Sequence, residues 1–319
     1  MWSYLVRRLA QAFLILLIIT MLCFTLTRLS SDPMAEYANR PGMTDADRQV
    51  IRERLGLDQP IPIQYVKWLG LALQGNLGSS FFSHQPVLLM IQQRLPMTLI
   101  LMVTAEIFIV IIALILGLVS ALKQYSFTDN LITSFSFIGF SMPIFFIALG
   151  SIEIFAVQFK AWGLPYLPTG ADIWDPKDPL ALARHLVLPV FCLVTIQTAG
   201  YSRYLRSSIL EVLGMDYVRT AHAKGLSNRT VLFRHALRNA ILPFVTVVGL
   251  DIPFLLGGAL VTESIFAWPG MGRLFWEYAQ RGDYPVVLGV LLLTSSAVVF
   301  FTIVVDLAYT VIDPRIRLS

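Results

Sequence analysis

Charged side chains are scarce in this sequence. Only 14% of its 319 residues are Asp, Glu, Lys or Arg, whereas 56% are apolar, and the mean hydropathy is +0.70. Soluble domains carry about 25% charged residues, so this deficit excludes a chain that is soluble throughout. The apolar stretches leave no room for a sizeable soluble domain, and the sequence predicts a single transmembrane domain over residues 1–319.

Cysteine and histidine are too few and too scattered for a disulfide framework or a metal centre. Cys23 and Cys192 lie inside apolar stretches and are interpreted as small buried hydrophobic residues. The four histidines show no ligand spacing, so no metal site is expected. The sequence also lacks the G-x-x-x-x-G-K-[ST] motif that cradles nucleotide phosphates. We therefore expect a chain that is not an enzyme, with no catalytic residue, no cofactor of its own and no nucleic-acid partner.

Six apolar stretches are long enough to cross a bilayer, which takes about 18–20 residues. We place them at residues 9–27, 97–122, 132–158, 186–202, 241–262 and 286–312. The third contains Pro143, and the fifth opens at Pro243 and is interrupted by Pro253. Membrane helices tolerate proline where neighbouring helices satisfy the freed backbone groups. The predicted fold class is an all-α polytopic membrane protein with six transmembrane helices.

Basic residues indicate the orientation. With both termini inside, the inner segments hold 12 Lys and Arg against four acids, and the outer segments hold 12 of each over nearly twice the length. The inner segments are then residues 1–8, 123–130, 203–240 and 313–319. Basic residues in short loops stay on the cytoplasmic side, so both termini are predicted to be cytoplasmic. The outer segment 29–96 is expected to form short surface helices, one starting near Thr44 and one over 63–73.

The inner loop 203–240 is the most informative stretch, with seven basic residues against two acids. Gly214 and Gly225 predict two breaks. Between them, Asp216 is expected to cap a short helix over 217–224, and Ser227 to cap the next helix. A short helix between two breaks can dock in a cleft of a separate protein. The alternative is an ordinary basic loop that binds anionic lipid headgroups.

This loop resembles a known family. The run YVRTAHAKG at 217–225, followed by NAILP at 239–243, is similar to the "EAA…G…LP" loop of bacterial ABC importer permeases. The similarity is strongest to the dipeptide, oligopeptide and nickel branch. Arg219-Thr220-Ala221 stands where the general pattern has Glu-Ala-Ala, so no role for a glutamate carries over. Further similar stretches are LGLDQP at 55–60, QGNLGSS at 74–80, RLPMTL at 94–99, ESIFAWPGMGR at 263–273, DYPVV at 283–287 and DPRIR at 313–317.

The resemblance implies a type I ABC importer permease fold and an assembly in the bacterial plasma (inner) membrane. Two homologous permease subunits would form the pathway, surrounded by membrane lipid. Two ATP-binding subunits would bind ATP and Mg and receive the inner loops, and an extracytoplasmic binding protein would deliver the substrate. We expect a di- or oligopeptide substrate; nickel or another metal chelate, and an oligosaccharide, are alternatives. From other classes, an ion-coupled secondary transporter and a membrane scaffold without a pathway stay open.

The resemblance also implies the residues that couple this chain to the ATPase. They are Tyr217, Arg219, Ala221, His222, Ala223, Lys224 and Gly225. Ala221 and Ala223 are small enough for the helix to approach a partner closely, and Arg219 and Lys224 are expected to pair with acids at the rim of the groove.

Two further groups of residues are candidates for the pathway and its outer end. Glu106 and Asp251 lie near mid-depth of the second and fifth stretches, where a carboxylate is costly. Either they line the pathway and meet the ammonium end of a peptide or a chelated metal, or they are hydrogen-bonded between helices and only fix packing. Trp268, Pro269, Gly270 and Met271 are predicted to face outward, as an outer gate or a contact with the binding protein, or as an interfacial tryptophan anchor.

Overall fold

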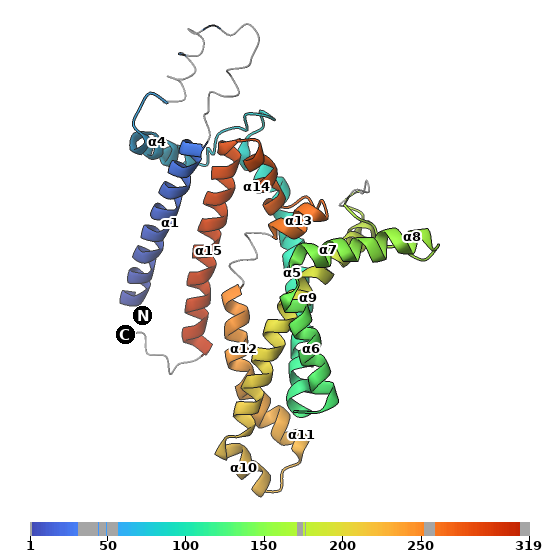
Figure 1. Ribbon diagram of the computed structural model, residues 1–319. Coiled ribbons are helices and arrows are strands. Elements are labelled where there is room, and N and C mark those ends of the chain that lie inside the picture. Colours follow the sequence, from blue (N-terminus) through green and yellow to red (C-terminus); the bar gives the residue numbers. More distant parts are fainter. Residues whose placement is uncertain are drawn as a thin grey trace. The chain divides into compact units, whose positions relative to one another are not determined.

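The computed structural model describes residues 2–30, 57–170, 177–251 and 259–312, together with Thr44, Gln49 and Asp175. Six of its helical segments are long and apolar enough to cross a membrane (Figure 1). They are Val6–Leu29, Val87–Leu122, Ile144–Ala161, Pro179–Leu213, Asn228–Asp251 and Tyr284–Val305. The prediction of an all-α polytopic membrane protein with six spans is therefore confirmed. Contacts divide the chain into two compact units, Met1–Thr98 with Pro269–Ser319 (unit 1) and Leu99–Trp268 (unit 2).

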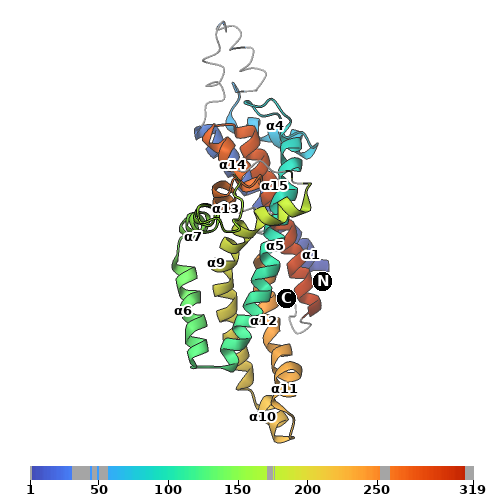
Figure 2. The ribbon, with the colours of Figure 1, turned by 90° about the vertical axis from the view of Figure 1, so that its right-hand side faces the viewer.

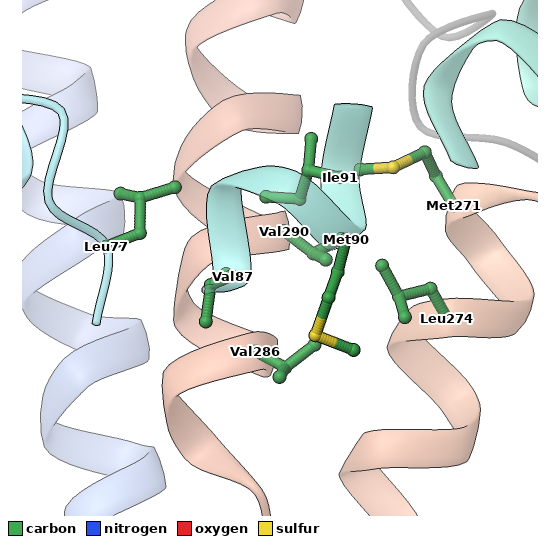
Figure 3. Close-up of a cluster of buried hydrophobic side chains, with 8 residues drawn as sticks. All are labelled: Leu77, Val87, Met90, Ile91, Met271, Leu274, Val286 and Val290. Carbon is green, nitrogen blue, oxygen red and sulfur yellow. The ribbon is translucent and has the colours of Figure 1, made fainter. Parts of the chain in front are cut away.

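Unit 1 packs helices from both ends of the sequence. It comprises α1 (Trp2–Ser30), α4 (Ile61–Leu73), the first turns of α5 (Val87–Leu122), α14 (Met271–Gln280) and α15 (Tyr284–Ile312). Helices α1 and α15 lie side by side (Figure 1). A buried cluster joins α5, α14 and α15 (Figure 3), and consists of Leu77, Val87, Met90, Ile91, Met271, Leu274, Val286 and Val290. These apolar contacts hold the outer segment against the last span.

One buried carboxylate fixes the loop that precedes α5. Asp283, at the start of α15, is fully buried. Its Oδ2 accepts hydrogen bonds from the Ser80 hydroxyl at 2.6 Å and from the backbone amides of Phe81 and Phe82 at 2.9 and 3.3 Å. A buried carboxylate is stable when several donors converge on it, so Asp283 orders this loop.

Unit 2 is built around one long central helix. It comprises the rest of α5 and, in chain order, α6 (Phe127–Ser141), α7 (Ile144–Ile152), the π-helix η1 (Glu153–Gln158), α8 (Phe159–Ala161), α9 (Pro179–Leu213), α10 (Asp216–Ala223), α11 (Asn228–Thr230), the π-helix η2 (Val231–Ala236), α12 (Leu237–Asp251) and α13 (Leu260–Ile265). Helix α9 lies between α6 and α12 (Figure 2). Small residues allow close approach along α9: a Cβ at Gly117 of α5 would lie 2.8 Å from the Ser202 carbonyl oxygen.

The third predicted span is not one helix. Helix α6 ends at Ser141 and α7 begins at Ile144, and Met142 between them is extended, with φ −82° and ψ 130°. Pro143 contributes to this break, because it lacks a backbone N–H and disfavours the helical conformation of the residue before it. The predicted bounds of the third span, 132–158, are therefore wrong at their start, since the apolar helical segment is Ile144–Ala161.

The fifth span begins earlier than predicted. The helical segment starts at Asn228, and Pro243 lies inside α12 rather than at its start. Pro253 and the DPRIR stretch lie outside the described residues. In the outer segment, the helix predicted over 63–73 is confirmed as α4, whereas the helix predicted from Thr44 falls mainly outside the described residues.

Candidate functional site

Helix α10 stands between two turns at the end of unit 2, beyond the ends of α9 and α12 (Figures 1 and 2). Its bounds, Asp216–Ala223, match the predicted helix within one residue. Gly225 follows with φ +77°, a left-handed backbone in which side chains are strained. Ser227 caps the next helix as predicted, since its hydroxyl accepts from the Thr230 amide at 3.3 Å. The expected cap at Asp216 is wrong: Met215 is the N-cap, and no side chain caps this end.

The two faces of α10 differ sharply. Val218 and Ala221 are buried and pack against Val231 of η2. The opposite face is exposed and carries Tyr217, Arg219, Thr220, His222, Ala223 and Lys224. The Tyr217 hydroxyl accepts a hydrogen bond at 3.0 Å from the Asn239 amide nitrogen, which ties α10 to α12. Ala221 therefore does not lie on the face open to a partner, and that part of the expectation is corrected: only Ala223 offers a small side chain there.

The charges on this face are largely free to meet a partner. Arg219 lies 3.8 Å from Asp216, but the two side chains are 76% and 97% exposed. Such a pair contributes little, because solvent screens it. Lys224 and His222 are also exposed. The exposed face of α10 is thus basic, and Ala223 is its one small side chain.

The structure brings Glu106 and Asp251 together through a residue that sequence reasoning missed. The Tyr201 hydroxyl donates to Asp251 Oδ2 at 2.6 Å and lies 3.3 Å from Glu106 Oε1. The three side chains come from α9, α12 and α5. A hydroxyl group has one proton and makes one strong hydrogen bond as a donor. The shorter distance indicates that Tyr201 donates to Asp251. Tyr201 is 5% exposed and packs edge-on to Phe244, with ring centroids 5.7 Å apart.

A phenol inside an apolar stretch was the available signal for Tyr201. Its hydroxyl needs a partner in a medium of low dielectric, and the carboxylates in nearby spans are the obvious acceptors. The sequence could not show which acid it meets, because that depends on how three helices pack.

A second missed cluster joins α6 to α9 in unit 2. Asp129 of α6 is 2% exposed and accepts two bonds from Arg206 of α9, at 3.0 Å to Oδ1 and 2.7 Å to Oδ2. The Ser120 hydroxyl and the Tyr125 amide also donate to it. The Arg206 guanidinium holds the pKa of the Asp129 carboxyl well below its usual range. This fork-to-fork pair fixes α6 against α9.

The four residues predicted at the outer end are mostly buried. Trp268 is 2% exposed, and its amide donates to the Glu263 carbonyl at 2.8 Å. Met271 is fully buried in the unit 1 cluster (Figure 3), and its amide donates to the Thr98 hydroxyl at 2.7 Å. The Trp268 and Met271 side chains are therefore not open to a partner on this surface, and their place at the outer end of the pathway stays a prediction. The exposed aromatic of this region is Trp276, on α14.

Comparisons with known proteins cover the whole chain. The family described as "Binding-protein-dependent transport system inner membrane component" matches residues 113–318, and its N-terminal counterpart matches residues 1–102. The chain is 41% identical, over 99% of its length and all of the relative, to the oligopeptide transport system permease protein AppB of Bacillus subtilis strain 168. It is 36% identical, over 99% of both chains, to the dipeptide transport system permease protein DppB of Escherichia coli K12. It is 37% identical, again over 99% of both, to the glutathione transport system permease protein GsiC of Escherichia coli O6:H1.

A solved structure described as an amino acid ABC transporter with histidines shares the fold. The TM-score is 0.53 at 13% identity, covering 69% of this chain and 92% of that one. Six spans, this fold and these relatives define a class, the multi-pass membrane components of transport systems. Within it, the chain belongs to the family of binding-protein-dependent transport system inner membrane components.

Proposed function

We propose that this chain is the permease subunit of an ATP-driven importer for di- or oligopeptides. Its relatives are named for oligopeptide and dipeptide transport, which supports that substrate class over a metal chelate or an oligosaccharide. A second homologous permease completes the pathway, and an extracytoplasmic binding protein delivers the peptide. Two partner subunits bind ATP and Mg, because this sequence has no nucleotide-binding motif.

The observation that carries the proposal is the construction of α10. The helix is held on one side by Val218 and Ala221 against Val231, and it is exposed and basic on the other. It also connects α9 to the segment that leads into α12. A partner that binds the exposed face can therefore pull on both long helices at once. Arg219 and Lys224 orient the partner, and Ala223 allows close approach.

The test places a bulky residue on each face of α10. In the purified complex, Ala223→Trp is expected to abolish peptide-stimulated ATP hydrolysis and uptake while the permease still inserts. Ala221→Trp is expected to act through the loop itself, because its side chain would displace Val218 and Val231. Ala279→Trp, at an exposed position of α14, is the matched control and should change neither the stimulated ATP hydrolysis nor the uptake. If Ala223→Trp kept normal peptide-stimulated ATP hydrolysis and normal subunit stoichiometry, the docking role of α10 would be wrong. The loop would then be interpreted as a basic segment that faces lipid.

Three residues line the proposed pathway in unit 2. Glu106, Tyr201 and Asp251 form a polar site inside unit 2, which suits the ammonium end of a peptide. An ion-coupled secondary transporter would use the same acids, and ATP dependence of uptake in proteoliposomes separates the two functions. For Trp268, Pro269, Gly270 and Met271, burial favours an outer gate over direct contact with the binding protein.

A further inference from the structure

A basic cavity in unit 1 has no part in the proposed function. Its volume is about 510 Å³, and residues of α1, α4, the 76–84 segment and the start of α15 line it. Three of the lining residues have basic side chains: Arg28, Lys67 and His84. Among the described residues that line the cavity there is no carboxylate. The cavity is therefore suited to an anion.

Arg28 is the residue that most needs an anionic partner. Its guanidinium lies over two aromatic rings, 5.2 Å from the centroid of Phe24 and 4.5 Å from that of Tyr284. Two of its nitrogens, Nε and Nη1, are buried and have no hydrogen-bond acceptor in the part of the chain that the structure describes. The cation–π contacts offset part of the desolvation of the charge but provide no hydrogen-bond acceptor.

The acid that directly precedes the cavity-lining Tyr284 is engaged elsewhere. Asp283 accepts through Oδ2 from Ser80 and from the amides of Phe81 and Phe82. It forms no ion pair with Arg28, within the described residues. An oxyanion in the cavity would supply the missing acceptors, as charge-assisted bonds to the guanidinium.

The position of the cavity identifies the source of the oxyanion. Arg28 is the penultimate residue of the apolar span Val6–Leu29, at the level where hydrocarbon gives way to headgroups. Beside it, α4 exposes Ile63, Val66 and Leu73, which share one helical face. A short helix with an exposed apolar face, a tryptophan and a lysine is typical of the membrane interface, and Trp68 and Lys67 of α4 both line the cavity.

We propose that this cavity binds the phosphate of a phospholipid headgroup from the leaflet at the Ser30 end of α1. Arg28 is the main anchor and Lys67 the second. The acyl chains then leave the cavity past Leu71 of α4, which lines it and is 49% exposed. Such a lipid would hold the interfacial helix α4 against α1. The bound lipid would therefore stabilise this part of unit 1.

The experiment measures lipid retention by the purified importer complex with native mass spectrometry. The complex is titrated with phosphatidylglycerol, and separately with inorganic phosphate and with a peptide that has a free C-terminal carboxylate. Arg28→Gln is expected to weaken the tightest lipid site about tenfold or more, as loss of charge-assisted bonds predicts. The lipid affinity of Arg28→Lys should lie between those of the unmodified complex and Arg28→Gln, because lysine keeps the charge but lacks the planar guanidinium group. Lys67→Gln should weaken binding a few-fold.

Arg281→Gln is the matched control. Arg281 also lies over two rings, 5.7 Å from Phe82 and from Tyr278, but it is exposed and does not line the cavity. Its substitution should leave lipid retention unchanged. Equal retention in Arg28→Gln and the unmodified complex would overturn the proposal, as would displacement of the lipid by millimolar inorganic phosphate or by the peptide carboxylate. Should Arg28→Gln fail to assemble, Lys67→Gln, whose side chain is exposed, decides by the same measurement.

Discussion

At the scale of single residues, Asp129 shows how this chain keeps a charge where little water reaches. Four donors converge on its carboxylate: the Ser120 hydroxyl, the Tyr125 amide and two nitrogens of Arg206. Tyr125 has a left-handed backbone, with φ +60°, which aims its amide at the carboxylate. Removing one member of such a set leaves the others desolvated and unpaired.

We expect Asp129→Asn to destabilise the protein by about 2–4 kcal/mol, because Arg206 loses its anionic partner in a largely buried site. The measurement is thermal or denaturant unfolding of the purified protein in detergent. Asp216→Asn is the control: its carboxylate is 97% exposed beside Arg219, and its loss should change stability by less than about 0.5 kcal/mol. Similar losses of stability in the two variants would show that the Asp129–Arg206 pair stabilises the protein no more than an exposed ion pair does.

The same pair predicts the direction of the pH dependence. The folded pKa of Asp129 is lowered, chiefly by its hydrogen bonds with Arg206. As pH falls, the unfolded chain takes up the proton first, so this stabilisation is complete above the usual carboxyl pKa of about 3.9 and is lost below it. The stability difference between the unmodified protein and Asp129→Asn should be constant from pH 8 to about pH 5 and shrink below about pH 4. A difference that shrinks near pH 7 would contradict this cause.

The polar site around Tyr201 predicts coupled effects on transport. Tyr201→Phe removes only the hydroxyl and keeps the ring that packs on Phe244. We expect it and Asp251→Asn each to lower peptide uptake more than they lower assembly of the complex. Because the two side chains share one bond of 2.6 Å, the double variant should lose less than the sum of the two single losses. Equal losses of folded complex and of uptake would assign the cluster to packing alone.

At the scale of helices, the sequence predicted the features that depend on local residues but not those that depend on how helices pack. The bounds of α10 followed from the breaks at Gly214 and Gly225, and the start of α11 from the cap at Ser227, since these signals act within a few residues. The break at Met142 needed more than the presence of Pro143, because neighbouring helices decide whether a proline kinks or ends a membrane helix. Tyr201 and Arg206 were missed for the same reason: each meets a carboxylate on another helix, and no local pattern specifies which helices touch.

Close helix contact at Gly117 gives a prediction about α5 and α9. A Cβ there would lie 2.8 Å from the Ser202 carbonyl and 3.0 Å from Leu205, so one helix must shift. We expect Gly117→Ala to destabilise the protein by about 1–3 kcal/mol. Gly200→Ala on α9 is the control: a Cβ there meets nothing within 4 Å, so it should be neutral or stabilise by up to about 1 kcal/mol. Unfolding in detergent measures both, and a neutral Gly117→Ala would show that the helices separate easily.

At the scale of the whole molecule, the distribution of charge predicts the orientation in the membrane. The segments placed inside hold 12 basic residues against four acids, and α10 belongs to the most basic of them. The segments placed outside are balanced, and they include the end of α14. Because positive charge in short loops is retained in the cytoplasm, α10 and both termini should be cytoplasmic and the end of α14 extracytoplasmic.

Two exposed positions test this orientation directly. In a variant without Cys23 and Cys192, Gln280→Cys at the end of α14 should react with a membrane-impermeant maleimide in intact cells, and Lys224→Cys after α10 only after the membrane is opened. Both side chains are exposed, so a failure to react reports the membrane rather than burial. Reporter fusions after residue 40 and after residue 220 should likewise report opposite sides. If both cysteines reacted from the same side, the six-span topology with both termini inside would be wrong; a reaction of Lys224→Cys in intact cells would in addition leave α10 no route to a cytoplasmic ATPase.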